Sequence, residues 1–207
     1  MREVPICFNG HSVWMIKAGM KTQTRRPVGN LVVEDRGTIV VYSGRSHIAG
    51  YSGREPGEFP FSAVEEYAPY RVGDQLWVRE AYRLPAYYDS QPSPKGVWVE
   101  NMAEIPVLYE ATATVRGPKP PSVVAPFGKL RPSIHMPKWA SRIRLEVLRV
   151  WAEQLRDISA DDVCEEGCEV SSFPESWDAI YAKRGYGWDM NPWVYAFEFE
   201  EMSGTRD

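Results

Sequence analysis

The chain has 207 residues, and its 28 Asp and Glu outnumber its 24 Lys and Arg, which gives a net charge of −4. With 43% hydrophobic residues, this length predicts one hydrophobic core and excludes disordered and fibrous chains, while 16 Gly and 17 Pro predict more loop than usual. The acidic total excludes a protein that coats nucleic acid through charge alone, but it allows a local basic groove.

The hydropathy pattern predicts a protein of the cytoplasm with no membrane partner. No run of 18 apolar residues occurs, and residues 1–20 lack the basic start, apolar run and small-residue cleavage site of a secretory leader. The three cysteines, Cys7, Cys164 and Cys168, are sparse and odd in number, which indicates buried thiols in a reducing compartment rather than a disulfide framework.

The first half of the chain predicts a short helix followed by strands and long loops. Val13, Trp14 and Ile16 recur at helical spacing within residues 11–18, and Gly19 is a typical helix stop. We further expect a strand or tight connector at 20–26, strands at 38–42, 75–82, 96–100 and 106–113, a helical turn at 63–67, loop over most of 43–70, and an extended Pro-rich connection at 116–138.

The second half shows the most regular patterns. Alternation of apolar and polar residues predicts strands at 142–150 and 193–200. The Ser159 hydroxyl is expected to cap a helix at 160–166, and Ser172 opens a capping-box pattern before another helix. Several strands with short helices and no strand-helix-strand rhythm predict an α+β fold built on a small barrel or a strongly curled sheet.

Charge is unevenly distributed along the chain. Residues 129–149 contain six Lys and Arg against Glu146 alone, whereas 157–178 contain eight acidic residues and no Lys or Arg. One interpretation is that the two segments neutralise each other. The other is a basic wall for an anionic ligand, with His135, Met136 and Trp139 placed between the charges for stacking on a base.

The familiar catalytic signatures are missing from the sequence. It contains no GxSxG, HExxH or P-loop pattern and no glycine-rich dinucleotide fingerprint. The three His form no obvious pair, and Cys164 and Cys168 lack the CxxC spacing of a zinc site. We therefore predict neither a metal nor a cofactor.

The polar run 21–26 is the remaining candidate for chemistry. Lys21 can act as a base if its pKa falls, and burial or the neighbouring Arg25 and Arg26 would lower it. A Lys–Thr pair backed by a carboxylate suffices for amide hydrolysis. In a regular strand, however, Lys21 and Thr24 point to opposite faces, so cooperation would require a turn, a bulge or a helical turn.

These residues belong to a longer pattern that resembles a known family. The pattern comprises IKAGMKTQTRR at 16–26, VGDQLWVRE at 72–80, RPSIHMPKWASR at 131–142, LRDIS at 155–159, EEG at 165–167, WD at 177–178 and NPWV at 191–194. In this order it resembles the ASCH-domain proteins of phages and prophages, members of the PUA-like superfamily. The resemblance implies one ASCH domain over residues 1–207, with insertions at 28–70 and 83–106, in the cytoplasm of a bacterial host.

The resemblance implies a PUA-like β-barrel with flanking short helices and a cleft for RNA or a single modified base. Small bacterial ASCH proteins hydrolyse N(4)-acetylcytidine with a Lys and a Thr of a KTxT motif and a Glu after the long strand. By this resemblance the catalytic residues are Lys21, Thr24 and Glu166, with Glu165 the rival if the register shifts by one. Lys21 would deprotonate Thr24 or a water, and Glu166 would pass the proton to the leaving amine.

Other residues are candidates for binding a modified nucleoside or single-stranded nucleic acid. Trp77 and Trp193 lie on expected strands and fit a core better than a stacking platform, whereas Trp139 fits stacking. Arg79 with Glu80 forms either an internal ion pair or a cleft pair. The candidate binding set is Arg25, Arg26, Arg79, Glu80, His135, Lys138, Trp139 and Arg142.

The length and the Trp-rich RPSIHMPKWASR block depart from the small amidohydrolases. Two alternatives to an amidohydrolase therefore stay open. One is a non-catalytic reader of modified or single-stranded nucleic acid that uses the basic segment. The other is an RNA nuclease with His135 as its acid–base group.

Overall fold

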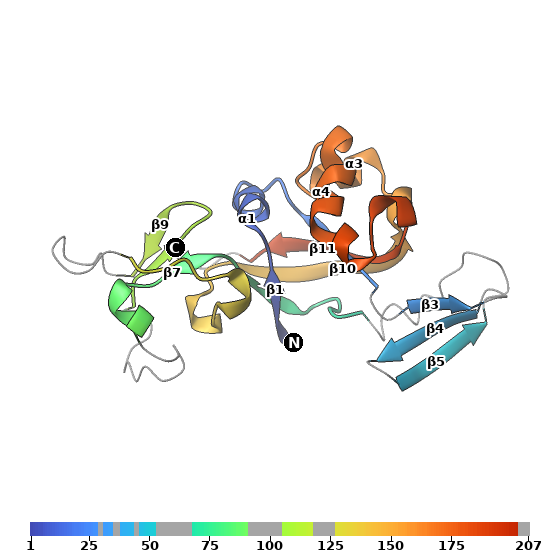
Figure 1. The fold of residues 1–207 in the computed structure, drawn as a ribbon, viewed down its shortest axis with the longest axis horizontal. Helices are drawn as coiled ribbons and strands as arrows, with labels where there is room; N and C mark the ends of the chain where they lie inside the picture. The colour runs from blue at the N-terminus through green and yellow to red at the C-terminus, as the bar shows by residue number, and fades with distance from the viewer. Residues whose placement is uncertain are drawn as a thin grey trace. The chain divides into compact units, whose positions relative to one another are not determined.

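The computed structural model describes residues 1–28, 31–34, 38–43, 46–52, 68–90, 105–117 and 127–202 (Figure 1). The chain divides into two compact units, which are described separately. The first unit comprises Met1–Gly19, Gln75–Glu146 and Glu201–Asp207, and the second comprises Met20–Asp74 and Val147–Glu200.

The fold is α+β, with a mixed five-stranded sheet, three-stranded sheets and short helices. The sheet orders are β1-β6-β10-β11-β2, β3-β4-β5 and β7-β8-β9, and the described strands do not close into a barrel. Strand β1 pairs parallel with β6, whereas β10 with β6 and β11 with β2 are antiparallel pairs. The strands are β1 (Glu3–Cys7), β2 (Gln23–Pro27), β3 (Leu31–Glu34), β4 (Thr38–Ser43), β5 (Ser46–Ser52), β6 (Gln75–Arg79), β7 (Tyr82–Arg83), β8 (Val107–Tyr109), β9 (Thr114–Arg116), β10 (Arg144–Gln154) and β11 (Trp193–Glu201).

The first unit contains the predicted N-terminal helix, α1 (Gly10–Lys17). Val13 and Ile16 are buried as expected, but Trp14 is 51% exposed. The buried side of this helix therefore includes Val13 and Ile16 but not Trp14. Gly19 follows the helix with φ of 71°, a conformation that glycine adopts without steric cost. A second cluster in this unit packs Tyr82, Leu84 and neighbouring apolar residues of the β7-β8-β9 sheet.

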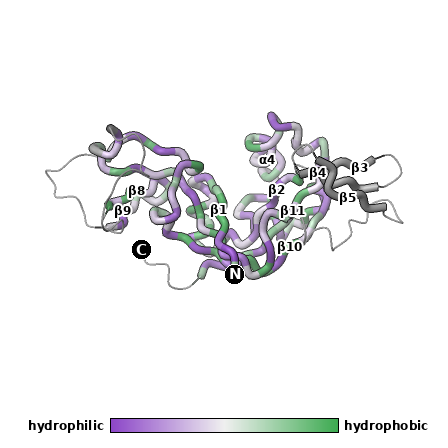
Figure 2. Tube along the Cα trace, turned by 90° about the horizontal axis from the view of Figure 1, so that it is seen from below, coloured by the Kyte–Doolittle hydropathy of each residue, from purple (hydrophilic) through white to green (hydrophobic). Residues whose placement is uncertain are grey.

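The second unit places helices α3 (Ala160–Glu165) and α4 (Phe173–Tyr181) against the sheet. Val163 of α3 and Trp177 of α4 pack with Val194 of β11. On the other face of β11, Tyr195 and Phe197 pack in a separate cluster. Successive side chains of a strand point to opposite faces, so the two clusters lie on the two sides of β11. Figure 2 colours the residues of this strand by hydropathy. The alternating strand predicted at 193–200 is therefore confirmed.

Serine residues precede both helices of the second unit, and only one of them caps its helix. The Ser159 hydroxyl accepts a hydrogen bond from the Asp162 amide at 3.1 Å, as predicted. The capping box predicted at Ser172 is wrong. Ser172 has helical dihedral angles, and its hydroxyl instead donates to the Glu169 carbonyl at 3.2 Å, because a preceding 3-10 turn already occupies this position.

This difference gives a matched pair of substitutions. Ser159→Ala should lower the free energy of unfolding by about 1 kcal/mol, because an amide of the first turn of α3 loses its acceptor. Ser172→Ala should change it by less than about 0.5 kcal/mol, since no cap bond is lost. Urea titration of both variants measures the difference, and equal losses would contradict the assignment of the cap.

Several predicted boundaries need correction. The strand expected at 38–42 is confirmed as β4, but part of the loop expected at 43–70 is strand β5, because antiparallel pairing with β4 stabilises a segment of weak strand propensity. The strand expected at 75–82 ends at Arg79, and Tyr82 already belongs to another sheet. The strand expected at 106–113 is interrupted by a turn after Tyr109.

The strand expected at 96–100 and the helical turn expected at 63–67 lie outside the described residues. Within the residues that are described, no helix has both the length and the apolar character needed to cross a membrane.

Candidate functional site

Lys21 and Glu166 form a buried ion pair in the second unit. The Lys21 Nζ lies 2.6 Å from Glu166 Oε2 and donates a further hydrogen bond to the Glu166 carbonyl at 2.7 Å. The two side chains are 3% and 8% exposed. The structure thus brings together two of the three predicted catalytic residues, and it places Glu166, rather than its rival Glu165, on the lysine.

Backbone geometry explains why these residues meet. The amide of Thr22 donates to the Glu165 carbonyl at 2.9 Å, which joins the start of β2 to the end of α3. Gly167 follows with φ of 74° and ends the helix, so the Glu166 carbonyl accepts its hydrogen bond from Lys21 rather than from a further helical turn. The Lys21 ammonium group therefore lies at the C-terminal end of α3, where it provides both a hydrogen-bond donor and a positive charge.

Arg25 lies deeper than Lys21 and connects Glu166 with β10. Its Nε lies 2.6 Å from Glu153 Oε1, and its Nη1 lies 3.0 Å from Gln23 Oε1 and 3.5 Å from Glu166 Oε1. Its Nη2 is 3.7 Å from Asp162 Oδ2 and makes no hydrogen bond among the described residues. Because its side chain has no exposed surface, Arg25 positions carboxylates and does not present a binding group to solvent.

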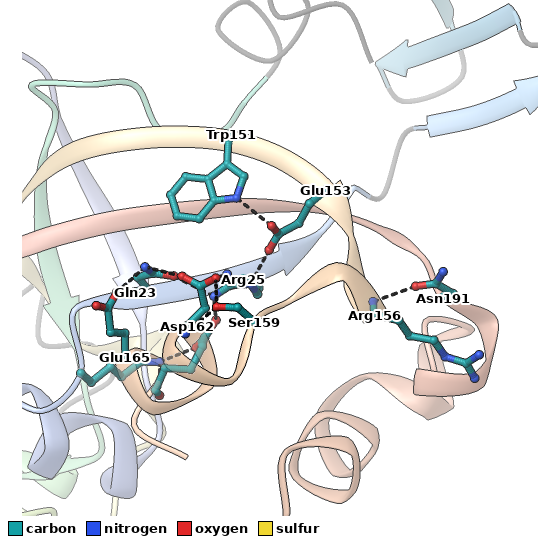
Figure 3. A network of polar contacts seen from close by, with 11 residues as sticks. Gln23, Arg25, Trp151, Glu153, Arg156, Ser159, Asp162, Glu165 and Asn191 are labelled. Atoms are coloured by element: carbon teal, nitrogen blue, oxygen red, sulfur yellow. Dashed lines mark hydrogen bonds and ion pairs between the residues drawn. The ribbon is translucent and has the colours of Figure 1, made fainter. Parts of the chain in front are cut away.

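Gln23 and Ser159 complete the polar cluster on the α3 side. The Gln23 amide donates to Asp162 Oδ1 at 2.9 Å and also contacts Glu165, and the Ser159 hydroxyl donates to Asp162 Oδ2 at 2.6 Å (Figure 3). Burial by itself would raise the pKa of Asp162, but the hydrogen bonds from Ser159 and Gln23 and the charge of Arg25 together lower it. The carboxylate is therefore held in its ionised form.

The surroundings of Lys21 lower the pKa of its ammonium group. Burial lowers the pKa of the Lys21 ammonium group, although the adjacent Glu166 carboxylate opposes this shift, and Arg26 lowers the pKa further. Burial also raises the pKa of the neighbouring Cys168 thiol. A buried lysine with a lowered pKa and a carboxylate at hydrogen-bond distance is a suitable acid–base pair.

Thr24 and Arg25 alternate along β2, so their side chains point to opposite faces of the strand. In the register with β11, Thr24 aligns with Phe197 and Arg25 aligns with Ala196, without a register shift. The hydrogen bond from the Phe199 amide to the Thr22 carbonyl, 2.8 Å long, continues the same pairing toward Lys21. The turn or bulge that would bring Lys21 and Thr24 together is therefore missing from the Thr22–Pro27 stretch.

Arg26 follows Arg25 on β2, so its side chain leaves the opposite face of the strand, and its guanidinium contacts α4. Its Nη1 donates to the Tyr181 hydroxyl at 2.8 Å. Arg26 thus links the outer strand β2 to helix α4. From the sequence, Arg26 was predicted to bind the ligand.

The other predicted binding residues belong to the first unit, and they have internal partners. Arg142 and Glu80 form a bidentate buried pair with distances of 2.9 and 3.1 Å. Arg79 does not pair with Glu80, because the two residues alternate at the end of β6. Its guanidinium lies 4.5 Å from the Trp77 ring centre and donates to the Ile134 carbonyl.

His135, Lys138 and Trp139 lie in and beside the 3-10 turns Ser133–His135 and Lys138–Ala140. His135 is exposed, Lys138 forms an ion pair with Glu3, and Trp139 packs partly buried against the first unit's core. Met136 is buried and cannot stack on a ligand.

The basic segment 129–149 does not pair with the acidic segment 157–178 in any ion pair of the described residues. Instead Arg131, Lys138 and Arg142 pair with Asp89, Glu3 and Glu80 respectively. Acidic residues of the other segment pair with Lys21 and Arg25. Charge compensation therefore occurs within each unit, between residues that are distant in sequence.

Gln23, Glu153 and Asp162 belong to the cluster, although the sequence patterns did not predict them as site residues. A signal for Gln23 exists, because Lys21, Gln23 and Arg25 alternate and so share one face of an extended segment. Glu153 lies on β10 beyond the predicted end of that strand, and its Oε2 also accepts a hydrogen bond from the Trp151 indole at 2.9 Å. Its role depends on strand pairing between distant segments, which alternation does not specify.

The described residues contain no group of three or more His, Cys, Asp or Glu side chains arranged to hold a metal ion. Comparison with known proteins gave no match to a family model, to a curated protein or to a solved structure.

Proposed function

We propose that the second unit binds an acylated pyrimidine nucleoside, with N(4)-acetylcytidine as the model substrate, and hydrolyses its exocyclic amide. The supporting observation is the buried contact of 2.6 Å between Lys21 and Glu166. It supplies the acid–base pair that amide hydrolysis requires. The same proposal includes three further points. The chain is a member of the ASCH-domain proteins, its fold is a PUA-like barrel, and it acts in the bacterial cytoplasm.

In this mechanism, water is the nucleophile. Lys21 in its neutral form takes a proton from the water, whose oxygen then attacks the acetyl carbonyl carbon. Lys21 passes this proton to Glu166 across their contact of 2.6 Å, and Glu166 delivers it to the exocyclic nitrogen as the C–N bond breaks. The products are acetic acid, which ionises to acetate, and the free amine of cytidine, and Lys21 and Glu166 return to their starting protonation states. Water is preferred over the Thr24 hydroxyl because Thr24 alternates with Arg25, which contacts Glu166, along a strand that has no bulge.

Arg25 contributes by positioning Glu166 rather than by touching the substrate. Its Nη1 lies 3.5 Å from Glu166 Oε1, while Oε2 contacts Lys21. The carboxylate is thereby held between the lysine and the arginine. A fixed orientation lets one oxygen accept and then return a proton without rotation of the side chain.

Turnover of N(4)-acetylcytidine to cytidine, followed by chromatography, tests the proposal. Glu166→Gln preserves shape but cannot carry the proton, so kcat should fall at least ~100-fold. Glu175→Gln, an exposed residue in the first turn of α4, is the matched control and should leave kcat unchanged. Thr24→Val should reduce kcat less than Glu166→Gln does.

Three outcomes would contradict parts of this proposal. A wild-type protein that releases no amine from any acylated nucleoside overturns the hydrolase. A loss with Glu165→Gln but not with Glu166→Gln moves the role to the rival carboxylate. A complete loss with Thr24→Val makes the threonine hydroxyl the nucleophile.

The second candidate function is a reader that binds a modified nucleoside without hydrolysing it. The observation in its favour is that Lys21 donates two hydrogen bonds to Glu166, an arrangement that also suits a permanent ion pair. Saturable binding of N(4)-acetylcytidine by the wild type, measured by calorimetry without release of cytidine, would support the reader.

A further inference from the structure

Helix α4 ends at Tyr181, whose ring is buried in the second unit. The residue is 6% exposed. Its ring centre lies 4.4 Å from that of Trp177, and both rings belong to the cluster that packs with Val194 of β11. Because these contacts hold the ring, the fold fixes the position of the Tyr181 hydroxyl before any ligand binds.

The Tyr181 hydroxyl accepts a hydrogen bond from a cation and keeps its own proton for another partner. Arg26 Nη1 donates to the phenolic oxygen at 2.8 Å. A phenolic hydroxyl can donate as well as accept, and its proton has no acceptor among the described residues. A second cation, Arg184, lies 6.0 Å from the ring centre. Hydrogen bonds in a chain polarise one another, so donation by Arg26 makes the Tyr181 O–H a stronger donor.

The Arg26 guanidinium lies near the Lys21–Glu166 pair as well as near Tyr181. Burial by itself would lower the pKa of Arg26, but the neighbouring tyrosine hydroxyls and the Glu166 carboxylate raise it. Arg26 in turn adds to the effect of burial in lowering the pKa of Lys21. Packing indicates the same proximity, because Cys168, two residues after Glu166, packs against the cluster that contains Tyr181. The hydroxyl and the acid–base pair therefore lie in one part of the second unit.

Hydrolysis of an amide needs a hydrogen-bond donor for the carbonyl oxygen in addition to an acid–base pair. Attack by water on the acetyl carbon moves an electron pair onto that oxygen, which is an oxyanion until the C–N bond breaks. Lys21 and Glu166 move the proton in this reaction, and they contact each other at 2.6 Å. A fixed donor aimed at the oxyanion usually makes the largest single contribution to such catalysis.

We propose that Tyr181 is this donor, with its O–H bonded to the acetyl oxygen of the substrate, and that Arg26 positions the hydroxyl. This role rests on the proposed hydrolysis and adds a second catalytic element to it. The O–H bond of Tyr181 stays intact. Its hydrogen bond shortens as the negative charge develops, and it lengthens again when the electron pair returns to form the carbonyl group of acetic acid.

Tyr181→Phe tests the donor, because it removes the hydroxyl and keeps the ring. With N(4)-acetylcytidine as substrate, kcat should fall roughly 100-fold while KM changes far less, since the hydrogen bond is strongest in the transition state.

The matched control is Tyr195→Phe. Tyr195 is 5% exposed, and burial alone raises the pKa of its hydroxyl to about 12, so no charged group of the described residues acts on it. This variant should keep the wild-type kcat, and urea titration should show that both variants are folded.

Variants of Arg26 test its positioning role. Arg26→Met should lower kcat by a factor similar to that of Tyr181→Phe, and Arg26→Lys, which keeps a charged donor, should lower it less. Adding Arg26→Met to Tyr181→Phe should cause no further loss, because both changes act on the same hydrogen bond to the substrate. Rates are compared at a pH above which kcat no longer increases, since loss of Arg26 also raises the pKa of Lys21. Losses that multiply in the double variant would overturn the positioning role.

Failure of the donor can be distinguished from failure of hydrolysis itself. A wild type without turnover overturns the hydrolase and the role of Tyr181 with it. Turnover that is lost in Glu166→Gln but unchanged in Tyr181→Phe overturns only the oxyanion donor. An equal loss in Tyr195→Phe also overturns it, because removal of any buried hydroxyl would then suffice. A rise of KM without a fall of kcat would make Tyr181 a binding residue and overturn its catalytic role.

Discussion

Lys21→Met should lower the free energy of unfolding by about 3–5 kcal/mol, the loss typical of a broken buried ion pair. The substitution leaves the buried Glu166 carboxylate without its contact at 2.6 Å, and only Arg25, at 3.5 Å, stays near it. The methionine matches the volume of lysine, so the loss reports electrostatics rather than a cavity. Urea titration followed by tryptophan fluorescence measures it.

Two companion variants make this result specific. Lys17→Met removes the same side chain from the Lys17–Glu201 pair, which is more than a quarter exposed, and should cost less than about 1 kcal/mol. Adding Glu166→Leu to Lys21→Met should recover much of the loss, because no unpaired charge is then buried. If Lys21→Met costs no more than Lys17→Met, the ion pair has no structural role.

Arg142→Met should destabilise the first unit by a similar amount, about 3–5 kcal/mol. Glu80 is 1% exposed and would lose both contacts with the guanidinium, at 2.9 and 3.1 Å. The hydroxyls of Thr112 and Thr114 would also lose a donor, and the Tyr109 ring would lose a cation 4.0 Å from its centre. Chemical denaturation is again the measurement.

The Arg83–Glu110 pair provides the matched control for Arg142. Arg83 also contacts both oxygens of a carboxylate, at 3.0 and 3.4 Å, but these two side chains are 31% and 42% exposed. Arg83→Met should therefore cost less than about 1 kcal/mol. Similar losses in Arg83→Met and Arg142→Met would show that burial does not determine the value of these pairs.

Much of the secondary structure could be predicted from the sequence, because it depends on local signals. The Ser159 cap, the stop at Gly19 and the alternation in 193–200 each involve neighbouring residues, and all three are found in the structure. The capping box at Ser172 failed although its pattern is equally good. A preceding turn, which the pattern does not include, determines the dihedral angles of that serine.

The site was harder to predict, because its contacts join distant segments. Lys21 is separated from Glu166 by 145 positions, and Arg142 from Glu80 by 62. The sequence shows that a buried charged side chain needs an oppositely charged partner. Which residue becomes that partner depends on how distant strands pair, and the sequence does not specify that pairing. That is why the sequence suggests Arg79, the neighbour in the chain, as the partner of Glu80, whereas the structure pairs Arg142 with it.

The place of β2 at the end of the sheet order has a consequence for association between copies of the chain. An outer strand exposes unpaired backbone groups that invite another strand to add to it. In β2, two arginines and a closing proline hinder such addition, and the Thr22 amide just before it is occupied by the end of α3. Charged residues and a proline on an outer strand are features that disfavour edge-to-edge addition of another strand.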